Sequence, residues 1–468
     1  MKRFFSNFLA SWLVSERRKR LIVRGARQVG KTWLVRELAR AGGRTRLEVN
    51  LDRNPEYARI FREEGGGPRR WLDDLALRTG VEARVEGLVL FLDEIQTAPE
   101  VLAKLRWFAE EMPELPVVAA GSLLEFALRD FEYSMPVGRV SFAFVEPMSF
   151  PEFLLAHGQE KLLERLEEWT PGIPLGDAAH AVAMEFYDRF LMTGGMPEVV
   201  AADAGGEPAG ECRRLQRDLL QTYRNDFAKY SGRMEPGILD DVLRGVVEQL
   251  GCKFTYSHVG GGVKHQQAKR ALDLLCMAQL CDSIPHAECN GVPLAGKIHG
   301  HLRKVVLLDV GLAHAFWNTP SGNSFPRWTD VAPALRGGLT EQGVAQQLRS
   351  ALGEPTRRGQ IFHWRRENGR AGEVDFVLEC HGRIVPVETK SGAAGAMKSL
   401  HQFLHDKSLP LAVRVDRNPP SLQKMQVKTT LGDPVEYQLL NLPHSLAWRI
   451  PAILEVLKPE CKIIPNGS

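Results

Sequence analysis

The sequence has no long hydrophobic run and no paired cysteines. None of its apolar stretches reaches the roughly 20 residues that a transmembrane helix needs. Its seven cysteines are an odd number without a C-x-x-C pair, which disfavours a disulfide framework and fits a reducing compartment. We therefore expect a cytoplasmic protein without a membrane partner.

The sequence also lacks a strong excess of either charge. Its net charge of +3 at pH 7 is too small to indicate a nucleic-acid partner by itself. Residues 336–468 nevertheless contain 18 lysines and arginines against 13 aspartates and glutamates, so the basic excess lies near the C-terminus. With 468 residues, of which 44% are hydrophobic, the chain is long enough for two to four domains.

The first residues predict an amphipathic helix rather than a signal peptide. Their apolar residues recur at i, i+3, i+4, i+7 and i+8, at Phe5, Phe8, Leu9, Trp12 and Leu13. The charged cluster at residues 16–20 is expected to form a solvated turn, with contact to nucleic acid as the alternative.

Candidate zinc ligands form one loose group, which consists of Cys276, Cys281, His286 and Cys289. Their spacing matches no familiar zinc site, and Cys276 is expected on the apolar face of a helix. Structural roles are therefore expected, and zinc binding is the alternative.

The most informative segment follows the apolar run 21–23 and precedes a predicted amphipathic helix. It has the pattern G-x-x-x-x-G-K-[ST] and consists of Gly25, Ala26, Arg27, Gln28, Val29, Gly30, Lys31 and Thr32. Glycines let backbone N–H groups face phosphates, while Lys31 reaches the terminal phosphates and Thr32 offers a hydroxyl to Mg²⁺. The pattern predicts a nucleotide site, with a glycine-rich turn that binds nothing as the alternative.

A second segment points to hydrolysis of the nucleotide. Residues 88–92 are a continuous apolar run that predicts a strand buried on both faces, and it ends in Asp93 and Glu94. Asp93 is placed to hold Mg²⁺ through water, and Glu94 to polarise the attacking water. We therefore expect ATP hydrolysis, while two solvated acids at a strand end are the alternative.

Strands and helices alternate over this part of the chain, which predicts a parallel sheet covered by helices. Ser122 follows the expected strand at 117–120, where its hydroxyl could contact the terminal phosphate or cap a helix.

These segments resemble AAA+ type P-loop ATPases of the bacterial and archaeal group that joins such a core to a C-terminal domain of nuclease-like fold. The resemblance rests on residues 24–32, 92–96, 120–122, 138–140 and 146–153. It implies that Ser122 is a sensor and that Arg139 is an arginine finger, acting on its own nucleotide or on that of a neighbour in a homo-oligomer. A surface role for Arg139 is the alternative.

The middle of the chain is expected to be mainly helical. Residues 264–275 are typical of the second helix of a helix-turn-helix. Its inward residues would be Ala271, Leu274 and Leu275, and its outward residues Lys264, Lys269 and Arg270. The family has a winged-helix-like module near this position, which implies contact with DNA, and a helical spacer is the alternative. Residues 304–312 predict a buried strand that ends in a turn.

A further group of candidate catalytic residues lies on a predicted hairpin near the C-terminus. Polar and apolar residues alternate over 373–378 and again over 383–390, which places Glu388 and Lys390 on one face of a strand and Asp375 on its neighbour. In such a site Asp375 and Glu388 bind Mg²⁺ against a phosphate while Lys390 activates water. Charged residues on a solvated strand face are the alternative.

The spacing D-x(12)-E-x-K is similar to that of the PD-(D/E)XK, or restriction-endonuclease-like, superfamily. Glu341 matches the acidic residue that this superfamily places on its first helix to complete the metal site. Pro386 restricts the pairing of its strand, and members of the superfamily can keep the fold after losing catalysis.

Together these patterns predict an α/β protein with three domains: an AAA+ ATPase core with a parallel sheet at 1–155, a helical region with a possible winged helix at 156–335, and a nuclease-like domain at 336–468. We expect a Mg²⁺-dependent ATPase whose C-terminal domain cuts or grips DNA. A non-cleaving switch that binds nucleic acid or a protein, and ATP-driven remodelling of a protein client, are the alternatives.

Overall fold

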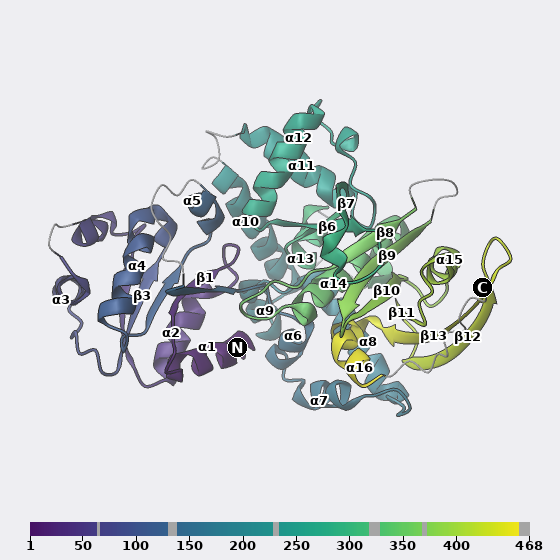
Figure 1. Cartoon of the computed structure of the whole chain (residues 1–468), viewed down its shortest axis with the longest axis horizontal. Helices are drawn as coiled ribbons and strands as arrows, with labels where there is room; N and C mark the ends of the chain where they lie inside the picture. The colour runs from purple at the N-terminus through teal and green to yellow at the C-terminus, as the bar shows by residue number, and fades with distance from the viewer. Residues whose placement is uncertain (63–65, 130–137, 228–233, 318–327, 367–371, 458–468) are drawn as a thin grey trace. The chain divides into compact units, whose positions relative to one another are not determined.

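A computed structural model describes residues 1–62, 66–129, 138–227, 234–317, 328–366 and 372–457. The chain forms two compact units, each with its own sheet (Figure 1). The first comprises Met1–Met148, Leu274–Leu280 and Glu354–Arg358, and the second comprises Ser149–Asp273, Cys281–Gly353 and Gly359–Ser468. None of the helices in the described ranges combines the length and the apolar character needed to cross a membrane.

The first unit is built around a five-stranded sheet in which every pairing is parallel. The order is β2-β3-β4-β1-β5, and β3 is buried along its whole length, as expected for a sheet covered on both faces. The strands are β1 (Arg20–Arg24), β2 (Thr45–Asn50), β3 (Leu88–Asp93), β4 (Val117–Ala120) and β5 (Val140–Phe144). The predicted parallel sheet is thus confirmed.

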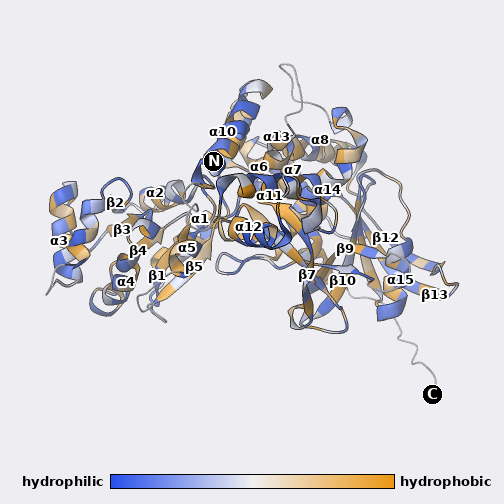
Figure 2. Cartoon of the chain, turned by 90° about the horizontal axis from the view of Figure 1, so that it is seen from above, coloured by the Kyte–Doolittle hydropathy of each residue, from blue (hydrophilic) through white to orange (hydrophobic). Residues whose placement is uncertain are grey.

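Helices flank these strands. Hydrophobic residues lie along the strands, whereas the helices carry hydrophobic and hydrophilic residues together (Figure 2). Helix α1 buries Leu9, Trp12 and Leu13 and packs against α2, which confirms the amphipathic helix. The helices are α1 (Phe5–Val14), α2 (Lys31–Ala41), α3 (Pro68–Thr79), α4 (Pro99–Glu111) and α5 (Leu124–Arg129), with a 3-10 turn at Pro55–Arg62.

The charged cluster at residues 16–20 is not entirely the solvated turn that was expected. Arg20 opens β1 and is 2% exposed. Its guanidinium donates to the backbone oxygens of Phe108 and Met112 at the end of α4. The side chain satisfies two C-terminal helix carbonyls, so its role is structural.

The second unit begins with a helical region, as predicted for the middle of the chain. Ser149 and Glu152 form a capping box at its start, in which each side chain binds the other's backbone N–H. The helices are α6 (Phe150–Ala156), α7 (Glu160–Glu168), α8 (Asp177–Thr193), α9 (Pro197–Ala204), α10 (Ala209–Phe227), α11 (Pro236–Glu248), α12 (His265–Met277), α13 (Val310–Phe316), α14 (Pro333–Leu352), α15 (Lys398–Lys407) and α16 (Ile450–Val456). The residues of α12 from Leu274 onward are assigned to the first unit.

The second sheet has eight strands and mixed pairing, in the order β12-β13-β11-β10-β9-β8-β6-β7. The strands are β6 (Cys281–Ala287), β7 (Ile298–Leu307), β8 (Phe362–Arg365), β9 (Glu373–Cys380), β10 (Arg383–Thr389), β11 (Leu411–Asp416), β12 (Ser421–Lys428) and β13 (Pro434–Pro443). The α/β fold class is therefore confirmed. Strands β6 and β7, which precede residue 336, belong to the same sheet as the strands that follow it. The division into domains at residue 336 stays a prediction.

The hairpin predicted near the C-terminus is β9 and β10, which pair antiparallel with Val387 opposite Phe376. Strand β10 also pairs in parallel with β11, and that ladder starts at Val387. Pro386 lies just before it, so its missing N–H costs no hydrogen bond to β11. This register explains how a proline is tolerated in a central strand.

Three buried histidines make the stability of the second unit depend on pH. Burial lowers the pKa of His363 and His444 to about 3 and that of His314 to about 4. Their stabilising effect is complete above the unfolded pKa near 6.5 and is lost as the pH falls toward these values. We expect the free energy of unfolding to fall by about 2 kcal/mol for each of these histidines when the pH is lowered from 7 to 5.

The comparison of wild type with His363→Gln isolates this effect in denaturant titrations at pH 7 and pH 5. It is needed because carboxyl groups with raised pKa, described below, respond to pH in the opposite sense. The variant is expected to show a smaller difference between the two pH values. An identical difference in both proteins would contradict the assignment.

Candidate functional site

The glycine-rich segment lies between β1 and α2, and its backbone needs glycine at two points. Gly25 has a φ of +153°, and a Cβ there would lie 2.5 Å from the backbone oxygen of Val145. Gly30 precedes α2 with a φ of +95°, in the left-handed region. The segment therefore has the strand–loop–helix setting in which backbone N–H groups at a helix N-terminus receive phosphates.

Lys31 is the first residue of α2 and is 8% exposed. Its Nζ donates to the backbone oxygens of Gly25, at 3.0 Å, and Ala26, at 2.7 Å. Burial lowers the pKa of this ammonium to about 8, although the charges of Glu94 and Asp93 oppose the shift. The Lys31 ammonium is thus bound by backbone oxygens of the loop that is predicted to bind phosphate.

Thr32 and the acidic pair meet at the ends of α2 and β3. Thr32 Oγ1 donates to Asp93 Oδ2 at 3.1 Å, and the Glu94 N–H donates to Asp93 Oδ1 at 3.1 Å. Burial, and then the charge of Glu94, raise the pKa of Asp93. A hydroxyl and a carboxylate in contact form the donor set that a hydrated Mg²⁺ takes in nucleotide sites, so these residues fit the ion.

Glu94 sits where β3 ends, with its backbone in the left-handed region at a φ of +53°. Its carboxylate accepts a hydrogen bond from Gln96 Nε2. A non-glycine residue held in this conformation is uncommon and often marks a functional position. Gln96 belongs to the segment 92–96 but was given no role from the sequence, and its contact places it beside the predicted water-activating group.

Ser122 follows β4, and β4 lies between β1 and β3 in the sheet. The carboxyl ends of these parallel strands therefore place Ser122 at the edge that carries the loop and the acidic pair. Its Oγ is buried and finds no hydrogen-bond partner among the described residues. An unpaired buried hydroxyl is unfavourable unless a ligand or water completes it, which fits a contact with phosphate.

Arg139 precedes β5, and its side chain is 56% exposed. Its Nε lies 3.2 Å from Glu110 Oε1 on α4. An exposed ion pair of this kind contributes little to stability. The role of Arg139 as an arginine finger stays a prediction.

Arg3 supports the loop and was missed by the sequence analysis. It is buried, and its guanidinium donates to the backbone oxygens of Val29, at 3.0 Å, and Glu146, at 2.8 Å. The residue lies 26 positions before the loop carbonyl that it binds. No local spacing could have indicated such a contact.

The candidate nuclease residues of the second unit gather around a lysine that the sequence analysis did not assign to them. Lys304 Nζ on β7 lies 2.7 Å from Glu373 Oε1, 3.0 Å from Glu341 Oε2 and 3.5 Å from Asp375 Oδ1. Glu341 belongs to α14, and the other two carboxylates to β9. A lysine in an otherwise apolar run was the available signal.

Glu388 and Lys390 lie at the end of β10, and Lys390 Nζ pairs with Glu388 Oε1. Asp375 Oδ2 accepts from the Thr389 N–H at 2.8 Å, which fixes it across the hairpin from Glu388. Burial, together with the charge of Asp375, raises the pKa of Glu341 to about 8 and that of Glu388 to about 7. The predicted residues are thus brought together at one end of the hairpin.

A lysine stands among the carboxylates at which a metal site was predicted. Lys304 contacts Glu341 and Asp375, two of the three proposed Mg²⁺ ligands. Within the described residues, no group of three histidine, cysteine, aspartate or glutamate side chains is placed to hold one ion. The Mg²⁺ site at Glu341, Asp375 and Glu388 therefore stays a prediction.

Helix α12 begins one residue after the start of the segment 264–275 that was predicted as a recognition helix, and contains the rest of it. Its inward residues Ala271, Leu274 and Leu275 are buried, and Lys264, Lys269 and Arg270 are exposed, as predicted. At the start of α12 a cavity of about 580 Å³ opens against β7. The described residues that line it include no acid; they are Lys253, Phe254, Thr255, Tyr256, Ser257, His265, Lys269, Gly300, His301 and Arg303.

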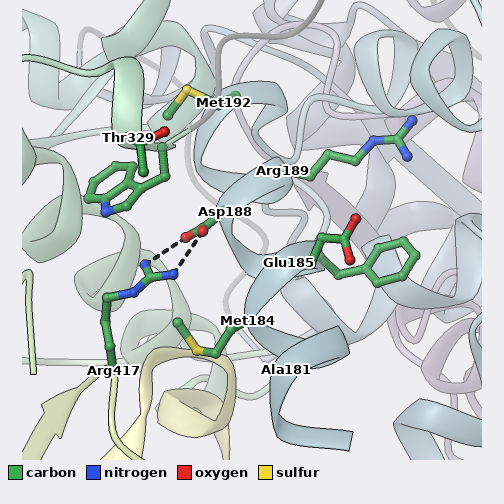
Figure 3. A pocket seen from close by; sticks show the side chains of 10 residues that line it. Ala181, Met184, Glu185, Asp188, Arg189, Met192, Thr329 and Arg417 are labelled. Atoms are coloured by element: carbon green, nitrogen blue, oxygen red, sulfur yellow. Dashed lines mark hydrogen bonds and ion pairs between the residues drawn. The ribbon is translucent and has the colours of Figure 1, made fainter. Parts of the chain in front are cut away.

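A larger cavity of about 800 Å³ lies beside α8 in the same unit. Asp188 and Arg417 point toward one another there and form two hydrogen bonds of 2.8 Å (Figure 3). Its other lining residues are Ala181, Met184, Glu185, Phe186, Arg189, Met192, Trp328 and Thr329. No sequence pattern indicated this cavity.

Comparison with known families identifies the first unit most clearly. Residues 17–154 match the model of the AAA domain family, so the chain carries an AAA-type P-loop domain. Residues 184–322 match a domain of unknown function, DUF8612, and residues 336–422 match another, DUF4143. No curated protein matches the chain.

Three solved structures show distant similarity to the chain. A Walker-type ATPase of Pyrococcus abyssi is 15% identical, with a TM-score of 0.42, over 67% of this chain and 96% of that one. The Aeropyrum pernix ORC2 protein in ADPNP–ADP complexes is 15% identical, with a TM-score of 0.32, over 60% and 86%. The ORC1 protein of the same organism, in complex with DNA, is 14% identical, with a TM-score of 0.28, over 68% and 91%.

Proposed function

We propose that this protein is a Mg²⁺-dependent ATPase whose nucleotide state controls how the second unit grips nucleic acid. The observation that carries the proposal is the 3.1 Å hydrogen bond between Thr32 and Asp93, beside a buried Lys31 that belongs to the phosphate loop. The match of residues 17–154 to the AAA domain family supports it.

The site residues divide the work of hydrolysis. Lys31 exchanges the carbonyls of Gly25 and Ala26 for phosphate oxygens, which a flexible ammonium with three donors does readily. Thr32 and Asp93 would hold Mg²⁺, which when bound neutralises phosphate charge. Glu94 takes a proton from the attacking water. The unpaired Ser122 hydroxyl donates to the terminal phosphate and thus distinguishes ATP from ADP.

For the second unit we propose a nuclease-like fold that binds the sugar–phosphate backbone. Support comes from the cavity at α12, where Lys253, Lys269 and Arg303 converge. Cations that line a cavity attract phosphates irrespective of base sequence, and no acid is among the described lining residues.

Cleavage is the second candidate function of this unit. It is favoured by the contact of Lys390 with Glu388, across the hairpin from Asp375. It would require Lys304 to leave Glu341 and Asp375 before those carboxylates could bind Mg²⁺. We therefore propose the gripping function first.

The test incubates the full chain with labelled linear, circular and single-stranded DNA, with Mg²⁺ or EDTA, and with or without ATP. We expect Mg²⁺-dependent phosphate release and DNA binding that weakens steeply with salt. DNA should remain intact. Cleavage in the wild type that disappears in Asp375→Asn would replace gripping by the nuclease function, and absence of phosphate release would overturn the ATPase proposal.

Arg139 gives a test of assembly. If it acts on a neighbour's nucleotide, turnover per chain should rise with protein concentration, and a mixture of Arg139→Ala with Lys31→Ala chains should regain activity because each supplies what the other lacks. Steady-state phosphate release measures both effects, with the exposed Arg84→Ala as the matched control. If turnover per chain does not change with protein concentration and the mixture regains no activity, Arg139 either acts on the nucleotide of its own chain or is a surface residue without a catalytic role.

A further inference from the structure

The lysine within the carboxylate group of the second unit has no solvent-facing alternative. The Lys304 side chain is 3% exposed, and its ammonium also lies 5.9 Å from the centre of the Phe376 ring. Its three carboxylate contacts come from α14 and β9. An ammonium has three N–H donors, so each donor can meet one carboxylate.

The surrounding charges leave little for a second cation to neutralise. Four carboxylates take part: Glu341, Glu373, Asp375 and Glu388. Three cations face them, since Arg365 Nη1 lies 3.7 Å from Glu373 Oε2 and Lys390 pairs with Glu388. Lys304 and Glu388 are buried and the other charges are partly buried, and buried charges are tolerated only when they are nearly balanced.

A divalent ion would also compete for the position that the ammonium fills. Mg²⁺ binds carboxylate oxygens at about 2.0–2.1 Å with near-octahedral geometry. Glu341 and Asp375 both direct an oxygen to Lys304 Nζ. Placing a metal ion between them would put two cations in contact inside the protein, which is strongly repulsive at low dielectric.

We infer that the Lys304 ammonium is the resident cation of this carboxylate group and takes the place of a divalent metal ion. Strand β7 supplies the positive charge that joins α14 to β9, so these acidic residues serve to assemble the sheet and its helix rather than to bind Mg²⁺. This inference concerns the second unit alone and does not rest on ATP hydrolysis or on binding of nucleic acid.

The inference predicts that removal of the lysine creates a metal site. Mn²⁺ serves as the probe, with the nucleotide-free full chain titrated by calorimetry and by electron paramagnetic resonance. Wild type and Asp375→Asn should bind equal numbers of Mn²⁺. An ion bound at Thr32 and Asp93 would be present in both proteins and so would not affect this comparison. Lys304→Ala should bind one additional Mn²⁺ per chain, and Lys304→Ala/Asp375→Asn should lose it.

Folding of each variant is followed by circular dichroism. Lys304→Ala leaves three partly buried carboxylates without their cation and is expected to melt at lower temperature, with Mn²⁺ but not Na⁺ restoring the melting temperature. Two results would overturn the inference: a wild-type Mn²⁺ site that disappears in Asp375→Asn, or a folded Lys304→Ala protein that gains no ion. The first comparison holds even where Lys304→Ala does not fold.

Discussion

Glu94→Gln is expected to bind ATP with an affinity close to that of the wild type and to hydrolyse it about 100- to 1,000-fold more slowly. The carboxylate accepts a proton from water in the transition state, whereas an amide of nearly the same shape does not. Its position after β3 and its contact with Gln96 should persist, because glutamine keeps an oxygen acceptor. Phosphate release and a fluorescent-nucleotide titration measure the two steps separately.

Lys31→Ala should show the opposite balance, because the ammonium contacts phosphates in the ground state as well. We expect its ATP affinity to fall about 100-fold. Glu86→Gln, an exposed carboxyl of the same unit, is the matched control and should leave both steps unchanged. Wild-type turnover in Glu94→Gln would show that another group activates water.

The ATPase half of the candidate site was predictable because its geometry is local. The spacing from Gly25 to Thr32 sets the loop within one strand–turn–helix unit, and a short apolar run that ends in two acids is typical of a buried strand that reaches the edge of a sheet. Contacts between segments distant in the chain were not predictable. Arg3 reaches Val29, and Arg20 reaches Met112, through backbone carbonyls that carry no sequence signature.

In the second unit, too, local features were predictable from the sequence and contacts between distant segments were not. Alternation over residues 373–390 predicted the hairpin and the polar face that carries Asp375 and Glu388, and the structure has that pairing. The approach of Lys304 depends on β7 joining the far edge of the sheet, after β6. Sequence pattern indicates a strand but not its neighbour in a sheet, so the cation at the centre of the predicted catalytic group could not be foreseen.

Charge reversal at the α12 cavity should strongly weaken binding of nucleic acid. Lys253 and Lys269 approach the same cavity from either side of the turn before α12, and Lys269 is exposed. Each contact between a lysine and a phosphate releases about one counterion. The negative slope of log K against log salt should therefore become shallower by about 2 in the double variant Lys253→Glu/Lys269→Glu. Two repulsive carboxylates should reduce affinity further, to roughly one hundredth of the wild-type value at low salt.

The matched control reverses two exposed lysines elsewhere in the same unit, Lys161→Glu/Lys398→Glu, and changes net charge by the same amount. Fluorescence anisotropy with labelled single-stranded and duplex DNA between about 50 and 200 mM salt gives both affinity and slope. If the interaction were only a response to overall charge, the two double variants would weaken binding equally. A large loss confined to Lys253→Glu/Lys269→Glu instead places the phosphate backbone at the α12 cavity, because the two double variants have the same net charge and reverse charges at different positions.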